Sequence, residues 1–140
     1  MSNIRIAGLT IFLILSHNLC AFSESADFAR SIGLFEKTSG PQLLYPAGDK
    51  VDLTGRDFLE FRWVYDIGHA DRYIFKIYKG YNMYAKDLIF YEDLASSSAS
   101  VKVRSSLFEA DQAYTWSLVR VHIGGQKSDK SFSSFRVIGN

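Results

Sequence analysis

The sequence predicts an all-β domain, an antiparallel sandwich of two sheets with about seven strands. Three observations lead to this prediction. Apolar and polar residues alternate over several short segments, turn residues separate these segments about every 8–12 positions, and no long helical stripe is present. With 140 residues, 47% of them hydrophobic and 15% aromatic, the chain can bury one core of ordinary size.

Residues 57–65 form the clearest strand. Successive side chains of a strand point to opposite faces. Glu60 and Arg62 therefore fall on one face, and the other face carries the large apolar side chains Leu59, Phe61, Trp63 and Tyr65. A strand with one apolar face and one polar face is typical of one layer of a sandwich. We expect Trp63 in the core between the layers.

Further short strands follow from the same alternation. They are expected at residues 43–44, 51–53, 72–79, 84–91, 101–103, 114–118 and 135–137. The first two are interpreted as halves of one edge strand, broken at Pro46 because proline suits an edge or a strand end. Turns are expected at Gly80 and at the flexible hairpin around Gly124 and Gly125. About seven short strands with such turns are typical of an immunoglobulin-like sandwich.

Residues 1–23 have the layout of a secretory signal peptide. Arg5 precedes the apolar run 6–15, and Ala21-Phe22-Ser23 provides small residues for cleavage. The run is shorter than the roughly 20 residues that a spanning helix needs. We therefore expect an exported, periplasmic or extracellular product without membrane insertion after cleavage. An uncleaved anchor, or acylation of Cys20, is the alternative.

Residues 24–40 form an N-terminal lead or linker before the domain, which is expected at 41–140. Phe28, Ile32 and Phe35 share a helical stripe, while Gly33 disfavours a helix. The segment is interpreted either as a loose lead or as a short helix or strand that covers a sheet edge or docks on a partner.

The charge balance argues against two classes of partner. Loss of residues 1–23 removes Arg5, the only Lys or Arg there, which leaves 15 basic residues against 15 acidic ones. No basic stripe stands out. Nucleic acids and anionic membrane surfaces are bound largely through clustered Lys and Arg, so neither is expected as the main partner.

The chain resembles a fibronectin type III domain over about residues 41–138. The landmarks that carry the resemblance are Phe61-Arg-Trp63, Tyr73 and Phe75, Phe108 followed by Tyr114 and Trp116, and Phe135-Arg-Val137. Two regions depart from the family pattern. The loop 109–112 lacks the usual proline and glycine, and segment 80–95 is unusually rich in aromatic residues. The family implies interaction, spacing or accessory roles.

Two structural expectations rest on the residues themselves. Tyr114 should form a tyrosine corner, with its hydroxyl bonded to backbone upstream. Trp63, Phe75, Trp116 and Leu118 should pack between the sheets.

A tyrosine cluster is the best candidate for a binding site. It surrounds the connection between the third and fourth strands, beside Met83, and consists of Tyr78, Tyr81, Tyr84 and Tyr91. Exposed aromatic residues beside polar groups suit a stacking platform for sugars or a hot spot for a protein partner. The alternative is that two of them cover the edge of the core and the others are ordinary surface residues.

Neither a metal site nor a catalytic site is expected. Asp66, His69 and Asp71 share one loop, but a zinc site usually has four ligands and a calcium loop needs more oxygens. No catalytic motif is present, and His122 is interpreted as a surface residue at the end of a strand. No cofactor is expected.

The sequence therefore predicts an exported, non-catalytic binding or interaction module with a protein or glycan partner. One alternative is a carbohydrate-binding module that uses the tyrosine cluster. Another is a structural component of a surface assembly, which docks through residues 24–40 or by adding a strand at an exposed sheet edge.

Overall fold

The computed structural model describes residues 38–65 and 70–140. This part of the chain forms eight strands and two single-turn 3-10 helices. In chain order they are β1 (Leu43–Tyr45), β2 (Lys50–Asp52), β3 (Phe58–Trp63), β4 (Ala70–Lys79), η1 (Ala85–Asp87), β5 (Leu88–Ala95), β6 (Ser100–Arg104), η2 (Ser105–Leu107), β7 (Ala113–His122) and β8 (Ser131–Gly139).

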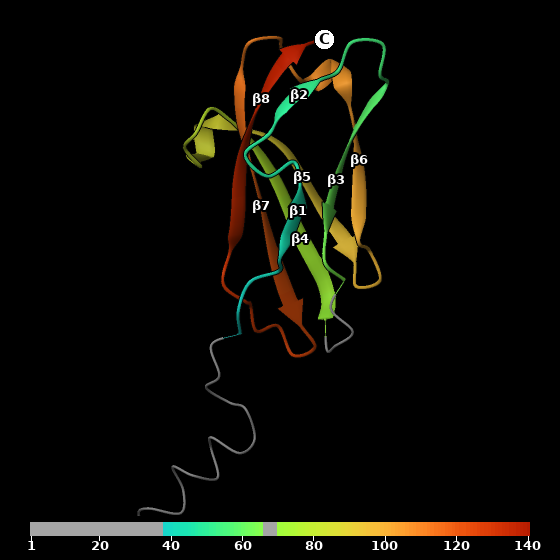
Figure 1. Ribbon diagram of the computed structural model, residues 1–140. Helices are drawn as coiled ribbons and strands as arrows, with labels where there is room; N and C mark the ends of the chain where they lie inside the picture. The colour runs from blue at the N-terminus through green and yellow to red at the C-terminus, as the bar shows by residue number, and fades with distance from the viewer. Residues whose placement is uncertain (1–37, 66–69) are drawn as a thin grey trace, which may run out of the picture. The chain divides into compact units, whose positions relative to one another are not determined.

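The strands form two sheets that pack face to face (Figure 1). The three-stranded sheet has the order β1-β3-β6, and the five-stranded sheet has the order β2-β8-β7-β4-β5. Every pair except β2–β8 is antiparallel. The predicted all-β, two-sheet sandwich is confirmed.

The first edge strand differs from the expectation. Residues 43–45 and 50–52 are not two halves of one strand in one sheet, because β1 pairs with β3 and β2 pairs in parallel with β8. Pro46 offers no N–H for a sheet ladder, and Gly48 has a φ of 81°, which only glycine adopts without strain. The chain therefore crosses from one sheet to the other between these residues.

The core lies between the inner faces of the sheets, and Phe61 is at its centre. The Phe61 ring meets four other rings at centroid distances from 5.1 to 6.3 Å, which belong to Phe75, Phe108, Trp116 and Phe135. Edge-to-face contacts dominate this cluster, as the quadrupoles of aromatic rings favour. The predicted core residues Trp63, Phe75, Trp116 and Leu118 are all buried.

Both buried indoles have a hydrogen-bond partner. Trp63 Nε1–H donates to the carbonyl of Ser98 at 3.0 Å, which closes the turn between β5 and β6 onto β3. Trp116 Nε1–H donates to the carbonyl of Pro46 at 2.7 Å. The second bond holds the β1–β2 connection against the centre of the five-stranded sheet.

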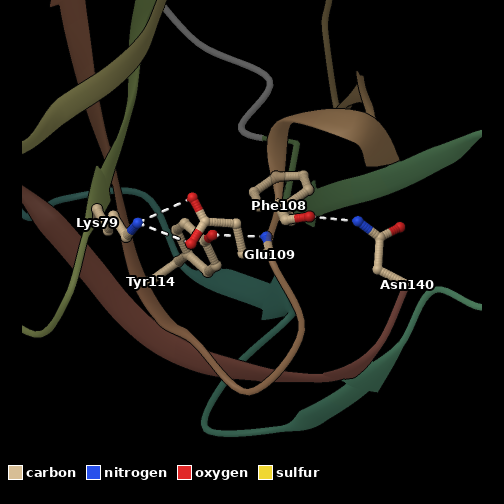
Figure 2. Close-up of polar contacts among 5 residues, drawn as sticks. All are labelled: Lys79, Phe108, Glu109, Tyr114 and Asn140. Atoms are coloured by element: carbon tan, nitrogen blue, oxygen red, sulfur yellow. Dashed lines mark hydrogen bonds and ion pairs between the residues drawn. The ribbon is translucent and has the colours of Figure 1, made fainter.

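The predicted tyrosine corner is present (Figure 2). The backbone N–H of Glu109 donates to the hydroxyl of Tyr114 at 2.8 Å. The Glu109 carboxylate also accepts from Lys79 Nζ, with both oxygens at 2.9 Å, and Asn140 donates to the carbonyl of Phe108. These bonds hold the β6–β7 connection against the end of β4 and the end of the chain. The bond to Glu109 raises the pKa of Lys79.

The segment before β1 touches the domain at Thr38. Its carbonyl accepts from the N–H of Asp129 at 3.0 Å, and its hydroxyl lies 3.2 Å from His122 Nε2. His122 is therefore half-buried and attaches the start of the described chain to the β7–β8 hairpin. Residues 1–37, including the expected signal peptide and most of the lead, lie outside the described residues.

The acidic loop after β3 is described only at its end. Asp66 and His69 lie outside the described residues, and Asp71 forms an ion pair with Arg72 at 2.9 Å. In residues 38–65 and 70–140, no group of three or more His, Cys, Asp or Glu side chains is placed to hold a metal ion. No helix in the same part is long and apolar enough to span a bilayer.

Candidate functional site

The connection between β4 and β5 carries the predicted tyrosines. It leaves the sheet at Gly80, whose φ of 87° suits glycine. Two hydrogen bonds fix this point: Gly80 N–H donates to the carbonyl of Ala113 at 2.7 Å, and Thr115 Oγ1–H donates to the carbonyl of Gly80 at 2.9 Å. Figure 1 shows the connection as a yellow-green loop that projects beyond the strands. The strand expected at 84–91 starts later, at Leu88, because residues 85–87 form η1.

Tyr81 and Tyr84 are the exposed aromatic residues of this loop. Tyr81 is 68% exposed and Tyr84 is 58% exposed. Lys86 Nζ lies 5.9 Å from the centroid of the Tyr84 ring, within the range of a cation–π contact. Met83, between the two tyrosines, is half-buried. The loop thus presents two large rings to solvent from a fixed base.

Tyr91 is also exposed, at 52%, but it belongs to β5 and lies in a polar surround. Its hydroxyl donates to Asp93 Oδ1 at 2.7 Å, and Lys76 Nζ lies 5.4 Å from its ring centroid. Arg72 Nε lies 3.7 Å from the other oxygen of Asp93. The hydrogen bond to Asp93 raises the pKa of Tyr91, because ionisation of the hydroxyl would remove the bond.

Tyr78 is buried, in contrast to the other three. Its exposed fraction is 5%, and it pairs with Thr115 of β7. The pairing of β4 with β5, by contrast, shifts register between Ile77 and Tyr78. Among the described residues, no two rings of the four tyrosines are in contact. The structure therefore does not bring Tyr78, Tyr81, Tyr84 and Tyr91 together as one platform.

Phe132 is an exposed aromatic residue that the sequence analysis did not select. It is 61% exposed and lies on the outer face of the five-stranded sheet, opposite Ser117. The alternation of the strand could have predicted this exposure. Phe135 and Val137 point inward, and Phe132 lies on the opposite face of the same strand. Ile74 and Val119 pair on the same outer face and are half-buried.

The outer face of the three-stranded sheet has a different composition. Arg62 lies over the Tyr45 ring at 5.6 Å and Arg104 over the Phe58 ring at 5.9 Å. A hollow of about 320 Å³ lies at the Arg104 end of this sheet. Its lining consists of Asp57, Phe58, Arg104, Ser105 and Ser106, so that it carries both signs of charge.

Comparisons with known proteins support the fold and identify no family or function. No protein-family model matches the chain. No curated protein matches it either.

Several solved structures are similar to this chain. A computationally redesigned β-sandwich protein superposes with a TM-score of 0.52 at 14% identity, covering 75% of this chain and 97% of its own. A fibronectin(III)-like module of Clostridium thermocellum CbhA has a TM-score of 0.48 at 14% identity, covering 71% of this chain and 96% of its own. The fn3 domain of human contactin 1 has a TM-score of 0.43 at 11% identity, covering 79% of this chain and 93% of its own.

The described domain is a fibronectin type III-like β-sandwich. The sheet order, the tyrosine corner at Tyr114 and the superposition on the redesigned sandwich support this assignment. At such identities the likeness concerns the fold alone. A shared fold does not by itself determine what this chain binds.

Proposed function

We propose that this chain is an exported, non-catalytic binding module whose partner contacts the β4–β5 connection. The observation that carries the proposal is the exposure of Tyr81 and Tyr84 on a loop fixed at Gly80. Tyr is enriched at the energetic centres of protein interfaces, because its ring is large and rigid and its hydroxyl tolerates water. A loop with a fixed base loses little conformational entropy when a partner binds.

A protein partner suits these tyrosines better than a sugar does. A sugar stacks on the flat face of a ring, and Lys86 and Lys76 lie over the faces of Tyr84 and Tyr91. A protein can contact the ring edges and the lysine ammonium groups together. Tyr81 has no cation over its ring among the described residues, so a glycan alternative would rest on Tyr81.

Photo-crosslinking at Tyr81 tests the proposal. Tyr81 is replaced by a photoreactive benzoyl-phenylalanine, and the matched control carries the same group at Phe58, which is exposed on the other sheet. After irradiation of cells that produce the chain, we expect a discrete protein adduct from position 81 and none from position 58. Equal adducts from both positions, or none from position 81, would contradict the proposal.

A glycan array with wild type and Tyr81→Ala separates the alternative. If the wild-type chain gives any glycan signal, we expect Tyr81→Ala to give the same signal. A reproducible glycan signal that disappears in Tyr81→Ala would contradict the proposed protein partner and support the carbohydrate-binding alternative.

Export is supported by the apolar run 6–15 and the small residues before Glu24. Mass spectrometry of the chain from its producing cells measures the mature N-terminus. We expect the mature chain to begin at Glu24. An intact N-terminus, or an acylated Cys20, would contradict release from the membrane.

A further inference from the structure

The two sheets end in four edge strands of unequal length. β1 and β2 have three residues each, β6 has five, and β5 has eight. An edge strand presents unpaired backbone N–H and C=O groups that another strand can bind. Among the described residues, β5 pairs only with β4, on its other side. The part of the chain that the structure describes therefore has one long edge.

The β5 edge lacks the short length, lysine and proline that protect many edges, although its pairing with β4 shifts register between Ile77 and Tyr78. Proteins shorten edge strands or place lysine or proline on them. β5 has the sequence Leu-Ile-Phe-Tyr-Glu-Asp-Leu-Ala, without lysine, arginine or proline. In contrast, the shorter β6 carries Lys102 and Arg104.

The middle of β5 is accessible from both faces of the sheet. Tyr91 points to the outer face, as Lys76 does, while Glu92 pairs with the buried Phe75 and points to the side of the core. Glu92 is nevertheless exposed, as are Tyr91 and Asp93. The three-stranded sheet therefore leaves this part of the inner face open, and side chains of an added strand would have space on both faces.

The charge of β5 indicates what kind of strand would fit. Asp93 already has the Tyr91 hydroxyl and Arg72 as partners. Glu92 has no ion pair or hydrogen bond among the described residues, and β5 contains no cation. A charged side chain that points inward at an edge discourages apolar strands and disfavours the pairing of two β5 strands, which would bring four carboxylates together. The same charge favours a strand that brings a cation.

We infer that β5 binds an extended, basic strand of a partner protein, with a Lys or Arg side chain beside Glu92. This inference rests on the proposed function and names the chemistry of the partner. Main-chain hydrogen bonds to the edge supply most of the affinity, and Glu92 supplies the preference for a basic sequence. The added strand lies beside Tyr91. The strand β5 itself follows directly after the loop that carries Tyr81 and Tyr84.

A peptide of the length of β5, 8 residues, is the probe, with valine and lysine alternating. Fluorescence anisotropy with the full chain measures its dissociation constant. One control peptide has the same composition in two blocks, and a second has N-methyl groups at alternate positions, which removes the donors of one edge. We expect the alternating peptide to bind more than about tenfold tighter than the N-methylated one, because several hydrogen bonds are lost together.

Two single-charge variants test the role of Glu92. Glu92→Gln keeps the size of the side chain, and we expect it to weaken binding of the alternating peptide about two- to fivefold, the range for an exposed ion pair. Glu60→Gln on the three-stranded sheet is the matched control, and its effect should be smaller than that of Glu92→Gln. Amide resonances of β5 should shift on titration, and those of β6 should not.

The inference is overturned if N-methylation leaves the affinity unchanged, if both variants weaken binding equally, or if the shifts fall on β6. Self-association of the chain through β5 without peptide would also overturn it, because the occupant would then be a second copy. These outcomes are independent of the crosslink at position 81. A protein adduct at position 81 without binding of the peptide would support the proposed binding function and contradict strand addition at β5.

Discussion

The outer faces of the two sheets differ, although their inner faces share one core. On the three-stranded sheet the outer face carries charged residues that solvent reaches, and Glu60 pairs in register with Lys102. On the five-stranded sheet the outer face buries polar and aromatic groups, including Thr115, Ser117 and Tyr78. The outer face of the three-stranded sheet is therefore solvated, whereas the outer face of the five-stranded sheet, the packed face, contains buried side chains.

The buried hydroxyl of Thr115 on the packed face has local hydrogen-bond partners. Thr115 Oγ1 donates to the carbonyl of Gly80 and lies 2.7 Å from Ser134 Oγ. Buried hydroxyls are retained in proteins when they have such partners. Because Gly80 starts the β4–β5 connection, the packed face also fixes the base of the tyrosine loop. The base of the β4–β5 connection is therefore held by the five-stranded sheet.

The largest expected effect concerns the shared core. Phe61→Ala removes a ring that contacts four others, and we expect the free energy of unfolding to fall by about 3–5 kcal/mol. Phe58→Ala is the matched control in the same strand, on the exposed face, and we expect a change within about 0.5 kcal/mol. Urea denaturation measures both. Equal losses would mean that β3 does not separate core from solvent as described.

An intermediate effect is expected on the packed face. Thr115→Val keeps the shape of the side chain and removes its hydroxyl, which leaves the carbonyl of Gly80 without this donor. We expect a loss of about 1–3 kcal/mol, against about 0.5 kcal/mol or less for Lys102→Met on the other outer face. Hydrogen exchange at the Gly80 amide should accelerate in Thr115→Val. If the two variants were equally stable, the contrast between the faces would fail.

The smallest expected effect is the titration of Tyr91. Its hydrogen bond to Asp93 raises the pKa, so the stabilisation is complete below the ordinary tyrosine pKa of about 10 and is lost as pH rises through the raised value. Asp93→Asn should lower the pKa of Tyr91 toward about 10, as measured by the ring carbon resonances in NMR. Arg72→Met should act in the opposite direction, because Arg72 lowers the pKa of Tyr91. A titration unaffected by Asp93→Asn would exclude this hydrogen bond in solution.

The sequence was most informative where one local rule decides the outcome. Alternation placed Phe61 and Trp63 on the inner face, and the spacing before Tyr114 predicted the tyrosine corner. Alternation was less informative at Tyr78, because the cover over the outer face comes from the packing of paired strands. Phe132 could have been found by the same alternation that placed Phe135.

The sequence by itself determined the two-layer β architecture, the composition of the core and the tyrosine-rich stretch after β4. These follow from side-chain period, hydrophobicity and turn residues, which act within a few positions along the chain. Only the tertiary structure decided that β2 leaves β1 to join β8, that Tyr78 is covered, and that β5 is a long edge on which Glu92 is exposed. Strand pairing joins residues far apart in the chain, so these outcomes depend on contacts that no local pattern records.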